Sequence, residues 1–178
     1  AGARLFVHAN VYEAFMQRLV AKTQALRVGH PEHAATQVGP LIDEKHLNSV
    51  DAYVRRAEQE GGQIVVGGHR LTEGDLAQGN YYAPTIIAGL GNRASVCQEE
   101  IFGPVLVVLP FEDEHDLVQQ ANDSVYGLAA GLWTENYRKA WQLARALDVG
   151  TVWINTYKKF SISTPFGGFK ESGVGREK

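Results

Sequence analysis

Apolar residues follow two different periods along this chain, and segments with the two periods alternate from one end to the other. Apolar residues recur every three to four positions, as in a helix with one buried face, over residues 11–27, 43–60, 112–123 and 134–147. Short, mostly apolar runs predict strands or extended segments at 4–8, 63–68, 81–90, 104–111, 126–134 and 150–155. This alternation is typical of an α/β fold of three layers, α/β/α, with a mostly parallel sheet.

Several local features sharpen this prediction. Asn10 and Thr134 stand where they can cap the helices that follow them. Pro84 cannot donate to a sheet ladder and therefore favours an edge or irregular strand over 81–90. The run PVLVVLPF at 104–111 is almost continuously apolar, which predicts a strand buried on both faces. No repeat or linker interrupts the pattern, so residues 1–178 are interpreted as one domain.

Composition narrows the class of protein. The chain has 178 residues, 44% of them hydrophobic and 21% charged, as in an ordinary globular domain. The net charge of −3 gives no electrostatic reason to expect a nucleic acid or an anionic membrane as a partner. A single cysteine rules out an internal disulfide framework, and no apolar run is long enough to span a membrane, so we expect a cytoplasmic protein.

The stretch SVCQEEIFGPVLVVL, residues 95–109, contains the one cysteine, Cys97, next to Glu99 and Glu100. A nucleophilic thiol needs a cation, a histidine or a helix N-terminus to stabilise its thiolate, whereas neighbouring carboxylates raise a thiol pKa. No His, Lys or Arg stands within three residues of Cys97. We therefore interpret Cys97 as a small half-buried residue at the end of a strand.

Two segments concentrate polar and aromatic residues at the ends of predicted strands. In EEIFGPV the carboxylates can bind the two hydroxyls of a ribose, although the spacing alone favours a solvated charge pair and a core phenylalanine. In NTYKKFSISTPFGGFK the rings of Tyr157, Phe160, Phe166 and Phe169 follow a buried strand, where ligands of open α/β sheets gather. Aromatic anchors that pin a loop would give the same pattern. His30 and His33 lie close together but lack a third metal ligand nearby.

Taken in order, these segments resemble the NAD(P)-dependent aldehyde dehydrogenase superfamily. The similar blocks are AGARLFVH, QEEIFGPVL, YGLAAGLWT, GTVWINTY and PFGGFKESGVGRE, and they span essentially the whole chain. The resemblance implies that the nucleophilic cysteine would stand two residues before Ala1, with the general base and the dinucleotide-binding region further upstream. Both ends of the chain look cut, so we expect a fragment of the catalytic domain that is inactive by itself.

The resemblance also assigns residues to the nicotinamide end of NAD or NADP and to the substrate tunnel. Glu100 matches the glutamate that binds the nicotinamide ribose, and Phe102 matches the ring packed near the nicotinamide. Leu128 and Phe166 match further residues around the nicotinamide, and Lys158, Phe160 and Phe166 fall where the family varies its tunnel lining. His46 stands where some members have a glutamine, and this departure keeps it off the predicted site.

The implied reaction is the oxidation of an aldehyde to its acid. A cysteine thiolate adds to the aldehyde, hydride passes to NAD(P)+, and water hydrolyses the thioester. The implied partners are an aldehyde substrate and further copies of the same chain, as a homodimer or homotetramer. Two alternatives stay open: a coenzyme A-acylating member of the superfamily, and a non-catalytic binding or assembly domain with the same fold.

Overall fold

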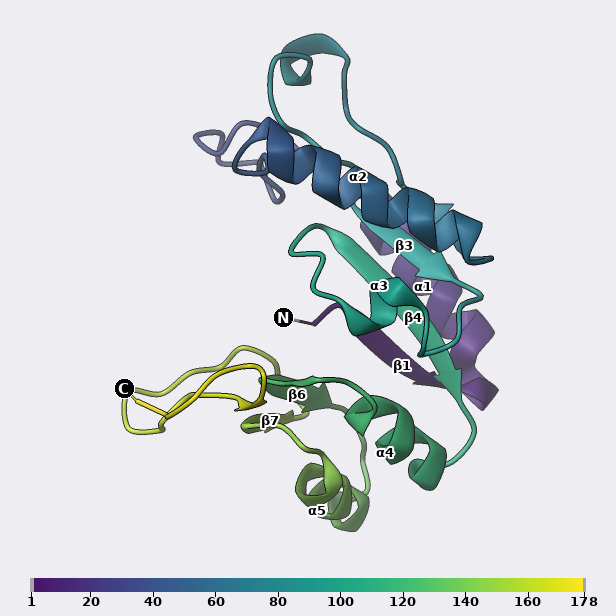
Figure 1. Cartoon of the computed structure of the whole chain (residues 1–178), viewed down its shortest axis with the longest axis vertical. Helices are drawn as coiled ribbons and strands as arrows, with labels where there is room; N and C mark the ends of the chain where they lie inside the picture. The colour runs from purple at the N-terminus through teal and green to yellow at the C-terminus, as the bar shows by residue number, and fades with distance from the viewer. Residues whose placement is uncertain (1, 178) are drawn as a thin grey trace. The chain divides into compact units, whose positions relative to one another are not determined.

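Residues 3–110 form a four-stranded sheet with helices on both of its faces, here called the sheet unit (Figure 1). The computed structural model describes residues 2–177, and it divides them into this unit and a C-terminal unit made of residues 111–177 together with Gly2. Each unit is described by itself. The sheet unit contains, in chain order, β1 (Arg4–His8), η1 (Ala9–Val11), α1 (Tyr12–Gln24), α2 (Glu44–Gln59), β2 (Gln63–Val66), η2 (Gly74–Leu76), β3 (Thr85–Ala88), α3 (Ser95–Gln98) and β4 (Val105–Phe111).

The sheet has the strand order β1-β4-β3-β2. β3 is parallel to β4, with Ile86 opposite Leu106, and β2 is antiparallel to β3, with Ile64 opposite Ile87. Because side chains alternate between the two faces of a strand, β3 and β4 supply residues to two separate cores. Ile87, Val105 and Val107 pack with α2 and α3 on one face. The other face packs against α1 through Ile86, Ala88 and Val108.

This arrangement confirms the predicted three layers and the mixed, mostly parallel α/β class. The two helices of the sheet unit that were predicted from periodicity are both present. In α2 the predicted stripe of Leu47, Val50, Val54 and Ala57 is buried, and Asp43 caps the helix by accepting a hydrogen bond from the His46 N–H. Val107 and Val108 of β4 are both fully buried, one on each face, as the continuous apolar run predicted.

The C-terminal unit has two small sheets and two helices. Its elements are α4 (Glu114–Asn122), β5 (Tyr126–Gly127), β6 (Ala129–Leu132), α5 (Tyr137–Ala146), β7 (Thr151–Ile154) and β8 (Phe169–Lys170). β6 pairs with β7 in parallel, and β5 pairs with β8 antiparallel. The interpretation of residues 1–178 as one domain stays a prediction.

Two local predictions are wrong, and a third is right in one of its two alternatives. Asn10 lies inside η1, where its N–H donates to His8 Nδ1, and α1 begins later without a side-chain cap. Asn136, not Thr134, caps α5; Thr134 instead accepts a hydrogen bond from the Asn136 N–H. For the segment 81–90 with Pro84, the edge strand is wrong and the irregular strand is right. β3 is central and begins only at Thr85, whose N–H donates to Pro104 O at 2.8 Å, while Tyr82 forms an isolated bridge. The hydrogen-bond ladder of β3 thus starts one residue after Pro84, which has no N–H to donate.

Candidate functional site

The segment between α3 and β4 presents an exposed ring from a fixed backbone. Ile101 is 2% exposed and anchors the segment in the core, whereas the next residue, Phe102, is 74% exposed. Phe102 has φ 55°, a left-handed conformation that is uncommon for a bulky residue. A Cβ on Gly103 would lie 2.7 Å from the Val50 side chain, so the turn approaches α2 too closely for a larger residue. Strained residues of this kind gather at ligand sites.

Glu99 and Glu100 are adjacent and both exposed, but their surroundings differ. Glu99 accepts a hydrogen bond of 2.8 Å from the Tyr53 hydroxyl and lies 3.4 Å from the Arg56 guanidinium. Within residues 2–177, Glu100 forms no hydrogen bond and no ion pair. The carboxylate that the resemblance assigned to a ligand is therefore the one that the protein leaves available.

His46, in the first turn of α2, holds the other side of this segment. Its Nε2 lies 2.8 Å from the Phe102 carbonyl oxygen, and its ring meets the Phe102 ring at a centroid distance of 6.1 Å and an angle of 62°. Because a carbonyl oxygen only accepts, Nε2 is the donor in this bond. Leaving His46 off the predicted site therefore missed a residue that contacts Phe102 directly. The sequence signal was the position of His46 in the family pattern. Histidine, like the glutamine of other members, can donate a hydrogen bond, and the difference in residue type concealed this.

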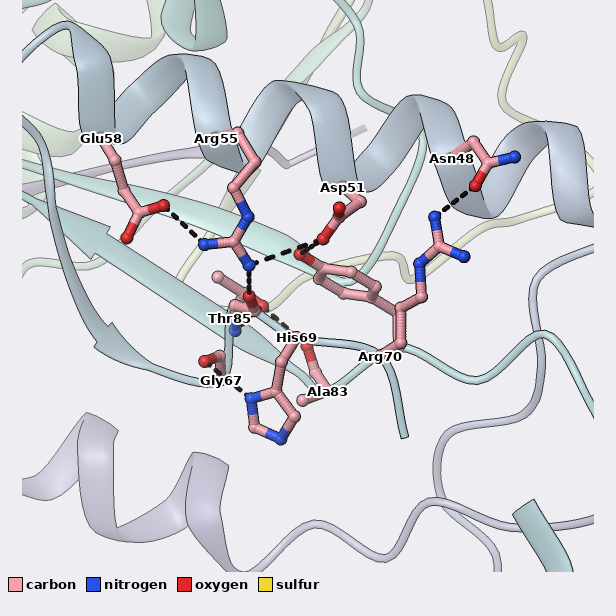
Figure 2. Close-up of polar contacts among 11 residues, drawn as sticks. Asn48, Asp51, Arg55, Glu58, Gly67, His69, Arg70, Ala83 and Thr85 are labelled. Carbon is pink, nitrogen blue, oxygen red and sulfur yellow. Dashed lines mark hydrogen bonds and ion pairs between the residues drawn. The ribbon is translucent and has the colours of Figure 1, made fainter. Parts of the chain in front are cut away.

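A polar network connects α2 to the segment between β2 and β3 (Figure 2). The Arg55 guanidinium donates to Glu58 at 2.6 Å, lies 3.6 Å from Asp51, and also donates to the Gly68 carbonyl. Nearer the start of α2, Asn48 accepts a hydrogen bond from Arg70, which lies in the segment between β2 and β3. Figure 2 shows Arg55 between Glu58 and Asp51, above the turn that bears Gly67 and His69. The loop between β2 and β3 is thus fixed to the helix that positions His46.

Buried Tyr82 links the same network to the core. Its hydroxyl donates to Asp51 at 3.0 Å, and its ring is 1% exposed. Burial raises the pKa of the Tyr82 phenol well above its ordinary value, and the hydrogen bond to Asp51 raises it further. Tyr82 therefore stays a neutral donor at physiological pH.

Cys97 lies in the core rather than at a reactive site. It belongs to the short helix α3 instead of the predicted strand end, and it is 5% exposed. Burial raises the pKa of its thiol to about 11, Arg4 lowers that pKa in part, and Glu60 raises it. Burial is thus the main cause, whereas the sequence argument had named the adjacent carboxylates. The conclusion that Cys97 is not a nucleophile is supported for a different reason.

In the C-terminal unit the loop after β7 carries an aromatic cluster around Trp153. The Trp153 ring, which is 8% exposed, lies 5.3 Å from Tyr157, 5.3 Å from Phe160 and 6.3 Å from Phe166, measured between ring centroids. The indole Nε1–H of Trp153 donates to the Lys159 carbonyl at 2.8 Å. This bond fixes the loop to β7. Trp153 was not predicted at the site, although a tryptophan at the end of a short buried strand is a recognisable anchor.

The predicted site residues fall into the two units. Glu100 and Phe102 lie in the sheet unit. The C-terminal unit contains Leu128, Lys158, Phe160 and Phe166. Leu128 is half-buried and stands between β5 and β6 in the sequence. Phe160 and Phe166 meet at 5.1 Å. Their convergence on one ligand stays a prediction. Among residues 2–177, no group of three His, Cys, Asp or Glu side chains could hold a metal ion, and no helix has the length and hydropathy to cross a membrane.

Comparison with known proteins agrees with this architecture. The sequence model of the aldehyde dehydrogenase family matches residues 1–178. A betaine aldehyde dehydrogenase from Staphylococcus aureus, solved in complex with NAD+, is 39% identical and superimposes with a TM-score of 0.97 over 99% of this chain and 35% of its own. The HpcC protein from Thermus thermophilus is 44% identical, with a TM-score of 0.96 over 98% of this chain and 35% of its own.

A putative aldehyde dehydrogenase from Burkholderia cenocepacia gives a similar result, with 40% identity and a TM-score of 0.97 over 99% of this chain and 36% of its own. The chain belongs to the aldehyde dehydrogenase family, as the resemblance predicted. It spans about a third of the length of these structures.

Proposed function

We propose that this chain is the part of an NAD(P)-dependent aldehyde dehydrogenase that binds the nicotinamide ribose and lines part of the aldehyde tunnel. The observation that carries the proposal is the contrast between two neighbouring carboxylates. Glu99 is engaged by Tyr53 and Arg56, whereas Glu100 is exposed and has no partner within residues 2–177. An ionised carboxylate accepts two hydroxyl hydrogen bonds well, and each is stronger than a neutral one.

The residues around Glu100 fit a nicotinamide riboside. Phe102 offers an exposed ring for a flat heterocycle, and His46 fixes the backbone that carries it. When bound, the cofactor supplies the acceptor for the hydride that the aldehyde carbon loses. The chain's own contribution is to hold and orient: Glu100 fixes the ribose, and the Phe102 ring limits the positions of the heterocycle. Such positioning is worth several kcal/mol where the reacting atoms must meet in one geometry.

The aldehyde is assigned to the loop after β7. There Phe160 and Phe166 pack against Trp153. The Lys158 ammonium lies over the Tyr157 ring of the same cluster. The family membership of the chain and the NAD+ held by the S. aureus relative support the cofactor class. We expect the full-length protein to assemble as a homodimer or homotetramer in the cytoplasm. The assembly state and the cytoplasmic location stay predictions.

The test is a pair of substitutions at adjacent positions in the full-length protein. Glu100→Gln keeps the shape but removes the charge, and we expect kcat to fall more than about tenfold, or about 1.4 kcal/mol of barrier. Glu99→Gln is the matched control and should leave kcat within about twofold. A primary isotope effect with deuterated aldehyde should grow in Glu100→Gln, because hydride transfer becomes limiting. If both variants behave alike, or if Glu100→Gln unfolds while its folded fraction keeps normal kcat, the proposed role of Glu100 is wrong.

The product separates this function from the coenzyme A-acylating alternative. The full-length protein should form free acid from aldehyde and NAD(P)+, with no requirement for coenzyme A. A non-catalytic domain would give no NAD(P)H at all. The 178-residue chain by itself should be inactive, because its single thiol is buried with a pKa of about 11. Turnover by that chain above a Cys97→Ala control would contradict this.

A further inference from the structure

The loop after β7 combines aromatic rings with two lysines, Lys158 and Lys159, that no acidic residue within 2–177 neutralises. From residue 155 to residue 170 the sequence contains three lysines and no Asp or Glu. Lys170 lies 3.7 Å from Asp148, and Lys139 of α5 pairs with Glu114. In contrast, neither Lys158 nor Lys159 forms an ion pair with any residue of the described range 2–177.

Lys158 is held at the edge of the aromatic cluster. Its Nζ lies 5.7 Å from the centre of the Tyr157 ring, and Tyr157 packs edge-on against Trp153. Lys158 also has φ 54°, a left-handed backbone that is uncommon for a residue other than glycine. The bond from Trp153 Nε1 to the next carbonyl, that of Lys159, stabilises this turn. The Lys158 ammonium thus lies over the Tyr157 ring, at the edge of the cluster.

The other rings of the cluster provide flat apolar surface around Trp153. Phe160 is 53% exposed and meets Phe166 nearly at right angles, at 5.1 Å, while Phe166 stacks on Trp153 at an angle of 27°. Edge-on and stacked rings of this kind accept another flat unsaturated group more readily than a flexible polar one. The cluster thus offers a flat apolar surface with a cation at its border.

The Lys158 ammonium determines which charge a ligand bound at this loop can carry. An aromatic cluster without charged neighbours attracts quaternary ammonium groups through cation–π interactions. Here the Lys158 ammonium already occupies a ring face and repels a second cation, with no carboxylate on the loop to offset it. A substrate such as the betaine aldehyde of the S. aureus relative's name would meet this repulsion. An anionic group would instead find an unpaired ammonium.

We propose that the substrate is an aldehyde with a flat, unsaturated body and a carboxylate remote from the carbonyl, which pairs with Lys158. The proposal rests on the proposed function, because it assigns the tunnel of an aldehyde dehydrogenase to this loop. Lys158 is a specificity-determining residue here and takes no part in the chemistry. Lys159 carries the same charge one residue further, but its role is the backbone carbonyl that accepts from Trp153.

The experiment compares three ring aldehydes that differ in charge at one position, with the full-length protein and NAD+ or NADP+. The probes are 4-formylbenzoate, 4-methylbenzaldehyde and the 4-formyl-N,N,N-trimethylanilinium ion. Each variant is compared with wild type on the same probe, so the intrinsic reactivity of the aldehyde cancels. We expect Lys158→Gln to lower kcat/KM for 4-formylbenzoate at least about tenfold, to change 4-methylbenzaldehyde less than about twofold, and to raise kcat/KM for the cation.

Lys159→Gln is the matched control, because it removes an equal charge and keeps the carbonyl that binds Trp153. It should leave all three values of kcat/KM within about twofold. An equal effect of the two substitutions would overturn the assignment to Lys158, as would an equal loss for the anionic and neutral probes. Oxidation of simple aldehydes but of none of the three probes would overturn this inference and leave the proposed function intact. Failure to oxidise any aldehyde would instead refute the proposed function itself.

Discussion

His46 Nε2 lies 2.8 Å from the carbonyl oxygen of Phe102, so the first turn of α2 fixes the backbone of an exposed ring 56 residues away in the sequence. Phe102 is held with φ 55° at the same time. A residue in this conformation returns to a more common one unless its surroundings prevent it. We therefore expect His46 to be a positioning residue, which acts through Phe102.

We predict that donor capacity at position 46 matters more than the imidazole. In the full-length protein His46→Gln keeps a side-chain donor and should leave kcat and the KM for the cofactor within about threefold of wild type. His46→Ala loses the donor and the ring contact, and should raise that KM about tenfold. Steady-state kinetics with varied NAD+ or NADP+ give both values. Similar kinetics for His46→Ala and wild type would show that Phe102 needs no support from α2.

Cys97 should react slowly and be dispensable. Burial raises the pKa of its thiol to about 11, so the thiolate fraction at pH 8 is small and the sulfur is covered. In the 178-residue chain the rate of alkylation by iodoacetamide should still be rising above pH 9, where an ordinary exposed thiol has levelled off. In the full-length protein Cys97→Ala should keep kcat within a few-fold of wild type. A plateau near pH 8.5, or a thousand-fold loss of kcat, would contradict the structure.

Tyr82 should make the fold sensitive to alkaline pH. Its pKa is raised in the folded state, mainly by burial, so the phenol contributes its full stability below the ordinary tyrosine pKa of about 10. That contribution is lost as the pH rises above about 10, because the unfolded chain then releases the proton more easily. Tyr82→Phe should unfold at a higher pH than wild type. At pH 7 it should be less stable by about 1 kcal/mol, since Asp51 loses a donor.

Circular dichroism during an alkaline titration measures both proteins, and absorbance at the tyrosinate band follows ionisation. Ionisation of Tyr82 should coincide with unfolding. A pH midpoint that is unchanged in Tyr82→Phe would show that another group controls alkaline unfolding.

The turn after β2 should tolerate only glycine at position 67. Gly67 has φ +73°, and a Cβ there would lie 2.3 Å from the Pro84 carbonyl oxygen. Gly61 has φ +94° with nothing within 4 Å of such a Cβ, so it isolates the backbone cost from the clash. Gly61→Ala should cost about 1 kcal/mol, and Gly67→Ala clearly more, with a visibly lower melting temperature. Equal melting temperatures for the two variants would mean that the turn relaxes around the added methyl.

The sequence pattern predicted those parts of the fold that depend on one segment at a time. The buried stripe of α2 and the two buried faces of β4 follow from spacing and from continuous apolar character. Helix starts were less predictable because several residues compete to cap them. Thr134 and Asn136 both have oxygen acceptors near the start of α5, and only the backbone geometry decides between them. β8 was missed because two residues give no period.

The candidate site shows the same division. Motif resemblance predicted Glu100 and Phe102 as site residues, which stays a prediction, but nothing in the spacing distinguished Glu100 from Glu99. That distinction depends on Tyr53 and Arg56, which approach from α2, 46 and 43 residues away in the sequence. Likewise, the rings of the loop after β7 were visible in the sequence. Their arrangement around Trp153 depends on tertiary contacts that the sequence does not show, among them the bond from the Trp153 indole to the Lys159 carbonyl.

That indole bond has a consequence for redesigning this protein. Trp153 holds the loop through the main chain of Lys159, and it makes no demand on the side chain at position 159. The support of the loop and the chemistry that it displays are therefore encoded by different atoms. A library of side chains at position 158 of the full-length protein, built with Trp153 and Phe160 kept constant, should change which aldehydes are accepted while the loop keeps its course. Substrate preference could then be changed by substitution on this loop, without a new backbone design.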